Sequence, residues 1–237
     1  MKRLFINVLA VGLSALALTS CAPKNEKGEQ AKKDYKESLS DSIEKYKIEI
    51  DSCEMQISTL RDKVDQWLRD FTTVANPREA APYMIMTSAQ NLYPLKSTGL
   101  LARINDSGQF ELIAALSSKP FDRITVVSDS QTSTSDIVPN DQGLNYRTPE
   151  LTTVSFTGAA ADSIGMLIAD NELNPVTVTY INGGKPVQSA KLSNEQSKVI
   201  SYTYLFYSDR SEMQRLERRV PMLHEKINLI RLHQEEK

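Results

Sequence analysis

The feature that most constrains this chain is a long series of apolar residues between positions 39 and 71, spaced alternately by four and three residues. This spacing places the side chains on one stripe of an α-helix, as in the a and d positions of a coiled coil. The segment has no glycine or proline, whereas Pro77 and Pro82 follow it and disfavour a continuing helix. We therefore predict a helix over residues 31–73. The members of the stripe are Leu39, Ile43, Tyr46, Ile50, Cys53, Ile57, Leu60, Val64, Trp67 and Phe71.

The C-terminal region repeats the same pattern over residues 199–230, with one polar interruption at Asp209. Two helix starts fit, Ser193 or Asp209, because each is followed three residues later by Gln or Glu, as in a capping box. We favour the longer helix, over residues 193–237, because the phase of the stripe continues across Asp209. Pro221 lies inside this segment and is expected to kink the helix or to cost it a backbone hydrogen bond.

Two long helices with one apolar stripe each most simply pack against each other in antiparallel orientation. Aligning Trp67 with Leu216 also brings Cys53 opposite Ile230, with further apolar pairs between these two levels. This register is the one that we predict for a two-helix stalk. A parallel homo-oligomer through the stalk is the competing use of the same pattern.

The residues between the helices, 80–192, predict a mainly antiparallel β head of one core. Two hairpins are the clearest elements: one around the turn Asn105-Asp106-Ser107-Gly108, the other around Gly183-Gly184. A short helix is expected over "AAADSIGMLIAD", although Gly165 weakens it. The fold class is therefore α+β, an antiparallel two-helix coiled-coil stalk whose helices flank a mainly antiparallel β head.

The first 20 residues are typical of a secretory signal peptide, since Lys2 and Arg3 precede an apolar run that is too short to span a membrane comfortably. Leu18-Thr19-Ser20-Cys21 resembles the lipobox of bacterial lipoproteins. The resemblance implies cleavage before Cys21, a lipid on its sulfur, and the membrane as a partner. Residues 21–30 are polar and predict a tether. Ala22 after the cysteine is similar to outer-membrane sorting signals, so we expect the outer membrane; periplasmic face and cell surface both remain open.

The rest of the sequence shows little that points to chemistry. Net charge is −2, which does not favour a nucleic-acid partner. The two histidines, His224 and His233, both fall in the predicted stalk, and their spacing does not suggest a metal site. No catalytic motif, cofactor motif or metal-binding motif occurs, and the acidic loop Asp129–Asp136 lacks the spacing of a calcium loop. Cys53 is the single thiol left after processing, and its position on the stripe predicts a small buried apolar residue.

Two further features concern surfaces. Tyr204 and Tyr207 lie off the helical stripe and are candidate surface contacts, with packing against the head as the alternative.

Asp41-Ser42-Ile43 and Asp162-Ser163-Ile164 resemble the O-glycosylation motif of exported Bacteroidetes proteins. The overall layout is similar to that of uncharacterised envelope lipoproteins of the same phylum, a resemblance that implies no activity.

These observations lead us to expect a non-enzymatic, lipid-anchored cell-envelope protein that presents a β-rich head on a helical stalk for binding or structural interaction. A carbohydrate- or peptide-binding accessory lipoprotein is the alternative, with a protein or glycan as the partner of the head. A hydrolase that uses carboxylates of the head is a third, weaker hypothesis.

Overall fold

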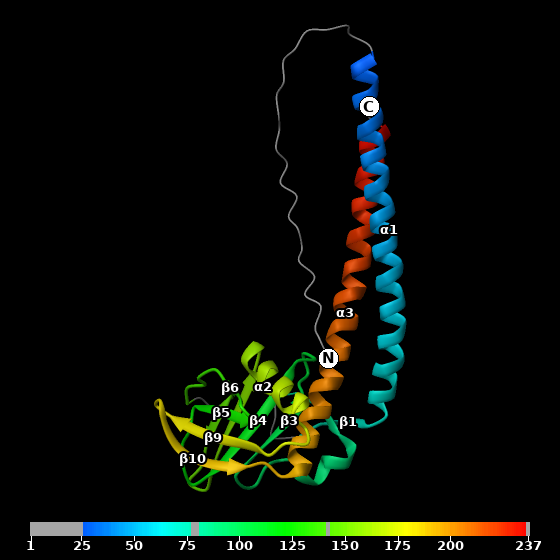
Figure 1. The fold of residues 1–237 in the computed structure, drawn as a ribbon. Helices are drawn as coiled ribbons and strands as arrows, with labels where there is room; N and C mark the ends of the chain where they lie inside the picture. The colour runs from blue at the N-terminus through cyan, green and yellow to red at the C-terminus, as the bar shows by residue number, and fades with distance from the viewer. Residues whose placement is uncertain (1–25, 77–80, 141–142, 236–237) are drawn as a thin grey trace.

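The computed structural model describes residues 26–76, 81–140 and 143–235. It shows the α+β architecture predicted from the sequence, with two long helices, α1 (Glu26–Leu68) and α3 (Asn194–Glu235), packed side by side in antiparallel orientation. The helices rise together from a β-rich domain that lies at one end of the molecule (Figure 1). We refer to the paired helices beyond that domain as the stalk and to the β-rich domain as the head.

The ends of both helices are set by local chemistry. The longer alternative for α3 is confirmed: Gln196 N–H donates to Ser193 Oγ and Ser193 N–H donates to Gln196 Oε1, each at 3.1 Å, which is a reciprocal capping box. α1 begins at Glu26, within the predicted tether, and ends at Leu68 rather than at residue 73. It ends early because the next residues form β1 (Phe71–Val74), which pairs with a strand of the head.

The predicted apolar stripes form the seam of the stalk. Charged residues bridge the two helices on both flanks of this seam: Arg61 donates to Glu217 at 3.1 Å on one flank, and Arg219 donates to Glu49 at 2.7 Å on the other. Cys53 is buried in the seam, as expected of a small apolar residue. The buried members of the seam are Ile50, Cys53, Ile57, Leu216, Leu223 and Ile227.

The predicted register of the stalk is wrong. Trp67 lies beside Tyr202 and Asp209 instead of Leu216: its ring centroid is 5.7 Å from that of Tyr202, and its indole N–H donates to Asp209 Oδ2 at 3.0 Å. Glu49, which the predicted register places level with residue 234, pairs with Arg219. A shift by whole heptads keeps apolar residues opposite one another, so the spacing alone does not select the register. The Trp67–Asp209 hydrogen bond favours the observed register, because the indole N–H needs an acceptor.

α3 continues through Pro221 as one helix from Asn194 to Glu235. Pro221 is exposed, and so is Glu217, whose carbonyl loses its amide donor to the proline. Water can hydrate a carbonyl on this exposed side, which lowers the cost of the lost hydrogen bond. The proline therefore does not end the helix.

Two antiparallel sheets make up the head. The six-stranded sheet has the order β1-β2-β3-β4-β8-β7, and the four-stranded sheet the order β10-β9-β5-β6. The strands of the first sheet beyond β1 are β2 (Tyr83–Met86), β3 (Gly99–Ile104), β4 (Phe110–Ser117), β8 (Leu151–Thr157) and β7 (Asn145–Arg147). Those of the second are β10 (Lys185–Lys191), β9 (Val176–Asn182), β5 (Arg123–Ser128) and β6 (Gln131–Thr134). The remaining elements are a 3₁₀ helix, η1 (Thr87–Leu92), and the helix α2 (Ala159–Asp170).

Both predicted hairpins and the predicted short helix are confirmed. β3 and β4 pair across the turn in which Gly108 N–H donates to Asn105 O at 2.9 Å. β9 and β10 pair across Gly183 and Gly184, whose φ angles of 55° and 79° suit the two central residues of a tight hairpin turn. The short segment predicted as a helix is α2.

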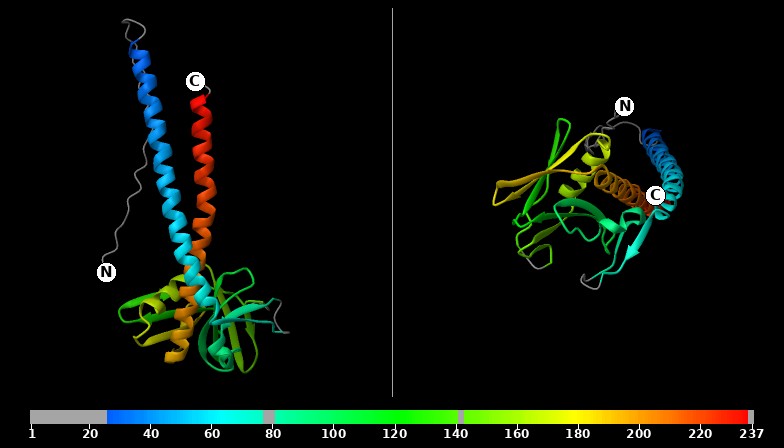
Figure 2. Two further views of the ribbon diagram at one scale, coloured as in Figure 1. Left: turned by 90° about the vertical axis from the view of Figure 1, so that its right-hand side faces the viewer. Right: turned by 90° about the horizontal axis from the view of Figure 1, so that it is seen from below.

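The first part of α3 runs through the head rather than beside it. Seen from below, the lower part of α3 lies among the strands and α2, whereas α1 lies outside them (Figure 2). Phe206 of α3 packs on Phe71 of β1 with ring centroids 4.6 Å apart, and Tyr180 of β9 donates to Gly99 O at 3.0 Å. One apolar core therefore joins both sheets to α3. Among the described helices, none combines the length and apolarity needed to cross a membrane.

Candidate functional site

The predicted lipidation site, Cys21, lies outside the described residues, as do the signal peptide and the cleavage position. The first described residue, Glu26, begins α1 at the end of the stalk that is farthest from the head (Figure 1). Four residues therefore separate Cys21 from a continuous helix that leads to the head.

Tyr204 and Tyr207, the candidate surface contacts, are half-buried and join α3 to α2 and β4. Both rings lie against Phe110, at centroid distances of 5.5 and 5.9 Å. Tyr207 Oη–H donates to Asp162 Oδ2 at 3.2 Å, and burial raises the pKa of both tyrosines. Burial also raises the pKa of Asp162, against the effect of the hydrogen bond from Tyr207. Tyr204 and Tyr207 therefore pack against the head, which was the alternative to a role as surface contacts. Only part of each ring is exposed and could contact a partner.

Gly165 of α2 has a role in this packing that the sequence did not reveal. A Cβ atom added to Gly165 would lie 2.6 Å from Tyr204 Cδ2 and 2.8 Å from Phe110 Cε1. These distances are too short for any side chain, so glycine allows α2 to approach α3 and β4 closely. The glycine that weakens the isolated helix is therefore required by its surroundings.

The other residues singled out from the sequence are spread over the molecule. Ser42 and Ser163 belong to the two motifs that resemble O-glycosylation sites. Ser163 is exposed on α2, and Ser42 on α1 is half-buried. Each hydroxyl donates to the carbonyl four residues earlier. His224 and His233 are exposed on α3. Within the described ranges there is no group of three or more His, Cys, Asp or Glu side chains placed to hold a metal ion.

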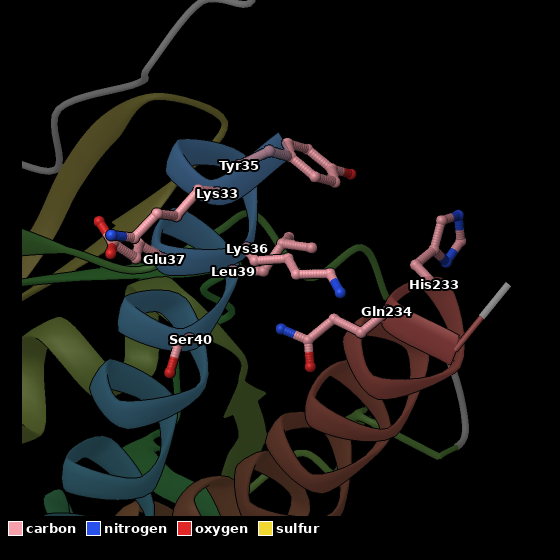
Figure 3. A pocket seen from close by; sticks show the side chains of 8 residues that line it. All are labelled: Lys33, Tyr35, Lys36, Glu37, Leu39, Ser40, His233 and Gln234. Carbon is pink, nitrogen blue, oxygen red and sulfur yellow. The ribbon is translucent and has the colours of Figure 1, made fainter. Parts of the chain in front are cut away.

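A hollow of about 530 Å³ occupies the free end of the stalk (Figure 3). Lys36 of α1 and Gln234 of α3 lie across the gap from each other, while Tyr35 and His233 extend over the open end. The hollow forms because the apolar seam ends near Leu39, and polar residues replace it. Its lining residues are Lys33, Tyr35, Lys36, Glu37, Leu39, Ser40, His233 and Gln234.

A second hollow, of about 540 Å³, lies in the head next to β1, β2 and η1. Its wall combines aromatic rings, Tyr83 and Tyr93, with the side-chain amides of Asn76 and Gln90. Tyr83 is buried, with the Arg103 guanidinium over its ring, so the wall offers chiefly its side-chain amides, which can donate and accept hydrogen bonds. The lining residues are Val74, Ala75, Asn76, Tyr83, Ile85, Gln90, Tyr93 and Pro94.

Buried polar contacts hold the wall of this head hollow in place. Arg103 donates to Glu111 at 2.7 Å between β3 and β4, and its guanidinium lies 4.3 Å from the centroid of the Tyr83 ring. Tyr93 Oη–H donates to the carbonyl of Ala102, and burial raises the pKa of Tyr93 well above its usual value. The tyrosine therefore remains a neutral donor at physiological pH. Arg103 neutralises Glu111, so this carboxylate is engaged in structure.

Sequence reasoning did not identify the head hollow. Its residues come from three separate segments, at positions 74–76, 83–85 and 90–94, and none of them belongs to a chemical motif. The only signal was the local concentration of Tyr, Asn and Gln around η1. Comparison with protein-family models, with curated proteins and with solved structures gives no match to this chain.

Proposed function

We propose that this protein is a non-enzymatic lipoprotein of the bacterial cell envelope, anchored through Cys21 in the outer membrane, whose stalk holds the head away from the bilayer for binding or structural interaction. The observation that carries the proposal is the path of α1. It begins five residues after Cys21 and continues for 43 residues to the edge of the head. At 1.5 Å per residue this helix is about 65 Å long, roughly twice the thickness of the hydrocarbon core of a bilayer.

The design of the molecule supports this role. The lipid and the head would lie at opposite ends of one rigid element, and α3 returns along α1 so that the helix is not isolated. Several acyl chains provide stable anchoring, because each buried CH₂ contributes about 0.8 kcal/mol. The lipid would therefore supply the membrane attachment and the head would supply the contacts.

Replacement of the lipidated cysteine tests the anchoring. In cells that express the full chain, Cys21→Ala should move the protein from the membrane fraction to the soluble fraction, because the acyl acceptor is lost. Cys53→Ala is the matched control, since Cys53 is buried in the seam, and this variant should remain with the membrane. Membrane partitioning of Cys21→Ala equal to that of the unchanged chain would contradict the proposal.

The head hollow favours a second candidate function, the binding of a carbohydrate or a short peptide. Its side-chain amides suit neutral, hydrogen-bonding ligands better than they suit chemistry on them. Titration with soluble N-acetylglucosamine oligomers and with short peptides should shift the NMR signals of the Asn76 and Gln90 side-chain amides. The side-chain amide of Asn171, at the end of α2, is the internal control. Shifts that are absent, or equal at all three amides, would exclude the hollow as the binding site.

A further inference from the structure

β1 is an edge strand of the six-stranded sheet, and its open side presents backbone groups. Thr87 N–H donates to Asp70 O at 2.8 Å, which fixes the alternation of hydrogen bonds between β1 and β2. In this alternation the N–H and C=O groups of Phe71 and Thr73 point away from β2. Among the backbone hydrogen bonds of the described residues, none reaches this open side. Thr73 is exposed, and β1 lies at the margin of the head when the molecule is seen from below (Figure 2).

An edge strand of the other sheet, β10, is protected against the addition of a strand, whereas β1 is not. β10 contains Pro186, which has no N–H to donate, and its pairing with β9 is irregular at this point. Lys185 and Lys191 belong to β10, and Lys119 Nζ donates to Val187 O at 3.4 Å. Prolines, bulges and lysines of this kind keep an edge from pairing with other chains. The sequence of β1, FTTV, has no proline and no charge, and its register with β2 is regular.

The head hollow lies beside this open edge, on the face of the β1–β2 hairpin that is turned away from α3. Phe71 faces α3, where it packs on Phe206. Val74 points to the opposite face and lines the hollow together with Tyr83 and Ile85 of β2. A strand added to β1 continues this alternation, so every second one of its side chains would point to the side of the hollow.

The chemistry of the hollow favours uncharged side chains. None of its eight lining residues carries a charge. Behind the wall, the carboxylate of Glu111 is already paired with Arg103 at 2.7 Å. Val74 and Ile85 offer apolar contact, and the side-chain amide of Gln90 offers a donor and an acceptor. A charged side chain would lose water in the hollow without gaining a counter-ion, which is unfavourable.

We propose that the head binds an extended peptide segment by strand addition to β1, with alternate uncharged side chains of the peptide in the head hollow. The inference rests on the second candidate function given above and deepens it, because it names a peptide as the ligand. Main-chain hydrogen bonds to Phe71 and Thr73 hold the peptide, and the hollow sets its side-chain preference. A carbohydrate in the hollow would leave these backbone groups of β1 unused.

Replacement of Thr73 tests the contact, because its N–H points away from β2. Thr73→Pro removes this N–H and places a ring at the edge, while the hydrogen bonds between β1 and β2 are kept. Thr73→Ala is the matched control, since it also removes the hydroxyl but keeps the N–H. The probe is a capped peptide of six alternating threonine and valine residues, added to the full chain in detergent. We expect Thr73→Pro to bind it about tenfold more weakly than the unchanged chain, and Thr73→Ala to bind it equally well.

A second measurement uses the unchanged chain and therefore does not depend on the folding of a variant. The Thr73 amide proton should exchange rapidly with solvent in the free chain, because it points away from β2. Saturation with the peptide probe should slow this exchange about tenfold. The control is the same peptide with methylated amide nitrogens, whose methyl groups obstruct a neighbouring strand, and it should leave the exchange unchanged.

The outcomes separate strand addition from binding in the hollow. Equal binding by the two Thr73 variants, or no slowing of the Thr73 exchange by the probe, would overturn the proposal. Shifts of the Asn76 and Gln90 amides without slower exchange at Thr73 would also overturn it, yet they would leave the hollow as a binding site. A dimer of the free chain that Thr73→Pro abolishes would assign the edge to a second copy, and would overturn the peptide as its occupant.

Discussion

α3 is one continuous helix in two different environments. Over residues 194–209 it is enclosed by the head, and buried residues occur on several of its sides, among them Ile200, Thr203 and Phe206. From Leu216 onward it packs on α1, and burial is restricted to one stripe, which includes Leu216 and Leu223. The same secondary structure is therefore stabilised by a three-dimensional core at one end and by a single seam at the other.

The difference shows what each part contributes. Burial of apolar surface stabilises in proportion to the area removed from water, so the enclosed part of α3 gains much more per residue than the stalk part does. The head therefore fixes the position and direction of α3, and the stalk extends from it. We expect local opening to begin at the free end of the stalk, where the hollow of Figure 3 replaces the seam.

Truncation of a side chain in the enclosed part should have the largest effect. Phe206 is fully buried and packs on Phe71, so Phe206→Ala removes contacts on several elements at once. We expect the free energy of unfolding to fall by about 3–5 kcal/mol, as for other buried aromatic residues. Urea unfolding followed by circular dichroism measures this change. Leu205→Ala, one residue away and exposed, should change stability by less than about 0.5 kcal/mol.

The corresponding change in the stalk should cost less. Leu223 is also fully buried, but it has only α1 to pack against, and the two helices can close part of the cavity. We expect Leu223→Ala to lower the free energy of unfolding by about 2–3 kcal/mol, at the low end for buried leucines. Met222→Ala is the exposed control. A loss for Leu223→Ala equal to or above that for Phe206→Ala would show that the stalk is as tightly packed as the head.

Gly165→Ala tests how closely α2 is packed on the enclosed part of α3. Alanine is the better helix former by about 1 kcal/mol, so an isolated α2 would be stabilised. In the protein, the new Cβ would lie 2.6 Å from Tyr204 and force α2 away, and overpacking of this kind costs about 1–3 kcal/mol. We expect a net loss of stability, measured as a lower thermal midpoint. Ser163→Ala on the exposed side of α2 should leave the midpoint unchanged, and stabilisation by Gly165→Ala would contradict the close packing.

The same comparison explains what the sequence could predict. Local sequence signals were sufficient to predict the helices and hairpins. The stripe of α1, the capping box at Ser193 and the glycines of the β9–β10 hairpin each depend on residues that are close together in the sequence. Register was not predictable, because the seam residues of neighbouring heptads are interchangeable, and polar contacts beside the seam, such as Trp67–Asp209 and Glu49–Arg219, distinguish the alternatives. The role of Gly165 and the head hollow depend on residues that are distant in sequence.

Asp209 marks the boundary between the two environments, and its replacement tests what sets the register. Asp209→Ala removes the acceptor of the Trp67 indole N–H and leaves this donor half-buried. We expect a loss of about 1 kcal/mol in the free energy of unfolding, together with a shift in the emission of Trp67, the only tryptophan in the chain. Ser208→Ala, exposed and adjacent, is the control. Unchanged emission from Trp67 in Asp209→Ala would mean that the hydrogen bond does not fix the register.

The smallest effect concerns Asp162, whose carboxyl lies between α2 and the enclosed part of α3. Burial raises its pKa in the folded chain, so the folded state binds the proton more readily than the unfolded state does. The resulting stabilisation is present below the ordinary pKa of aspartate, about 3.9, and is lost as pH rises through the raised value. Asp162→Asn keeps an acceptor for Tyr207 but cannot ionise. The stability of this variant relative to the unchanged chain should therefore increase slightly from pH 3 to pH 7, because Asp162 is only partly buried. Glu150→Gln, an exposed change on the loop before β8, is the control in urea unfolding at each pH. A relative stability of Asp162→Asn that decreases as pH rises would show that the folded state prefers the ionised carboxylate. In that case water would reach the contact between α2 and α3 more than the burial of Asp162 indicates.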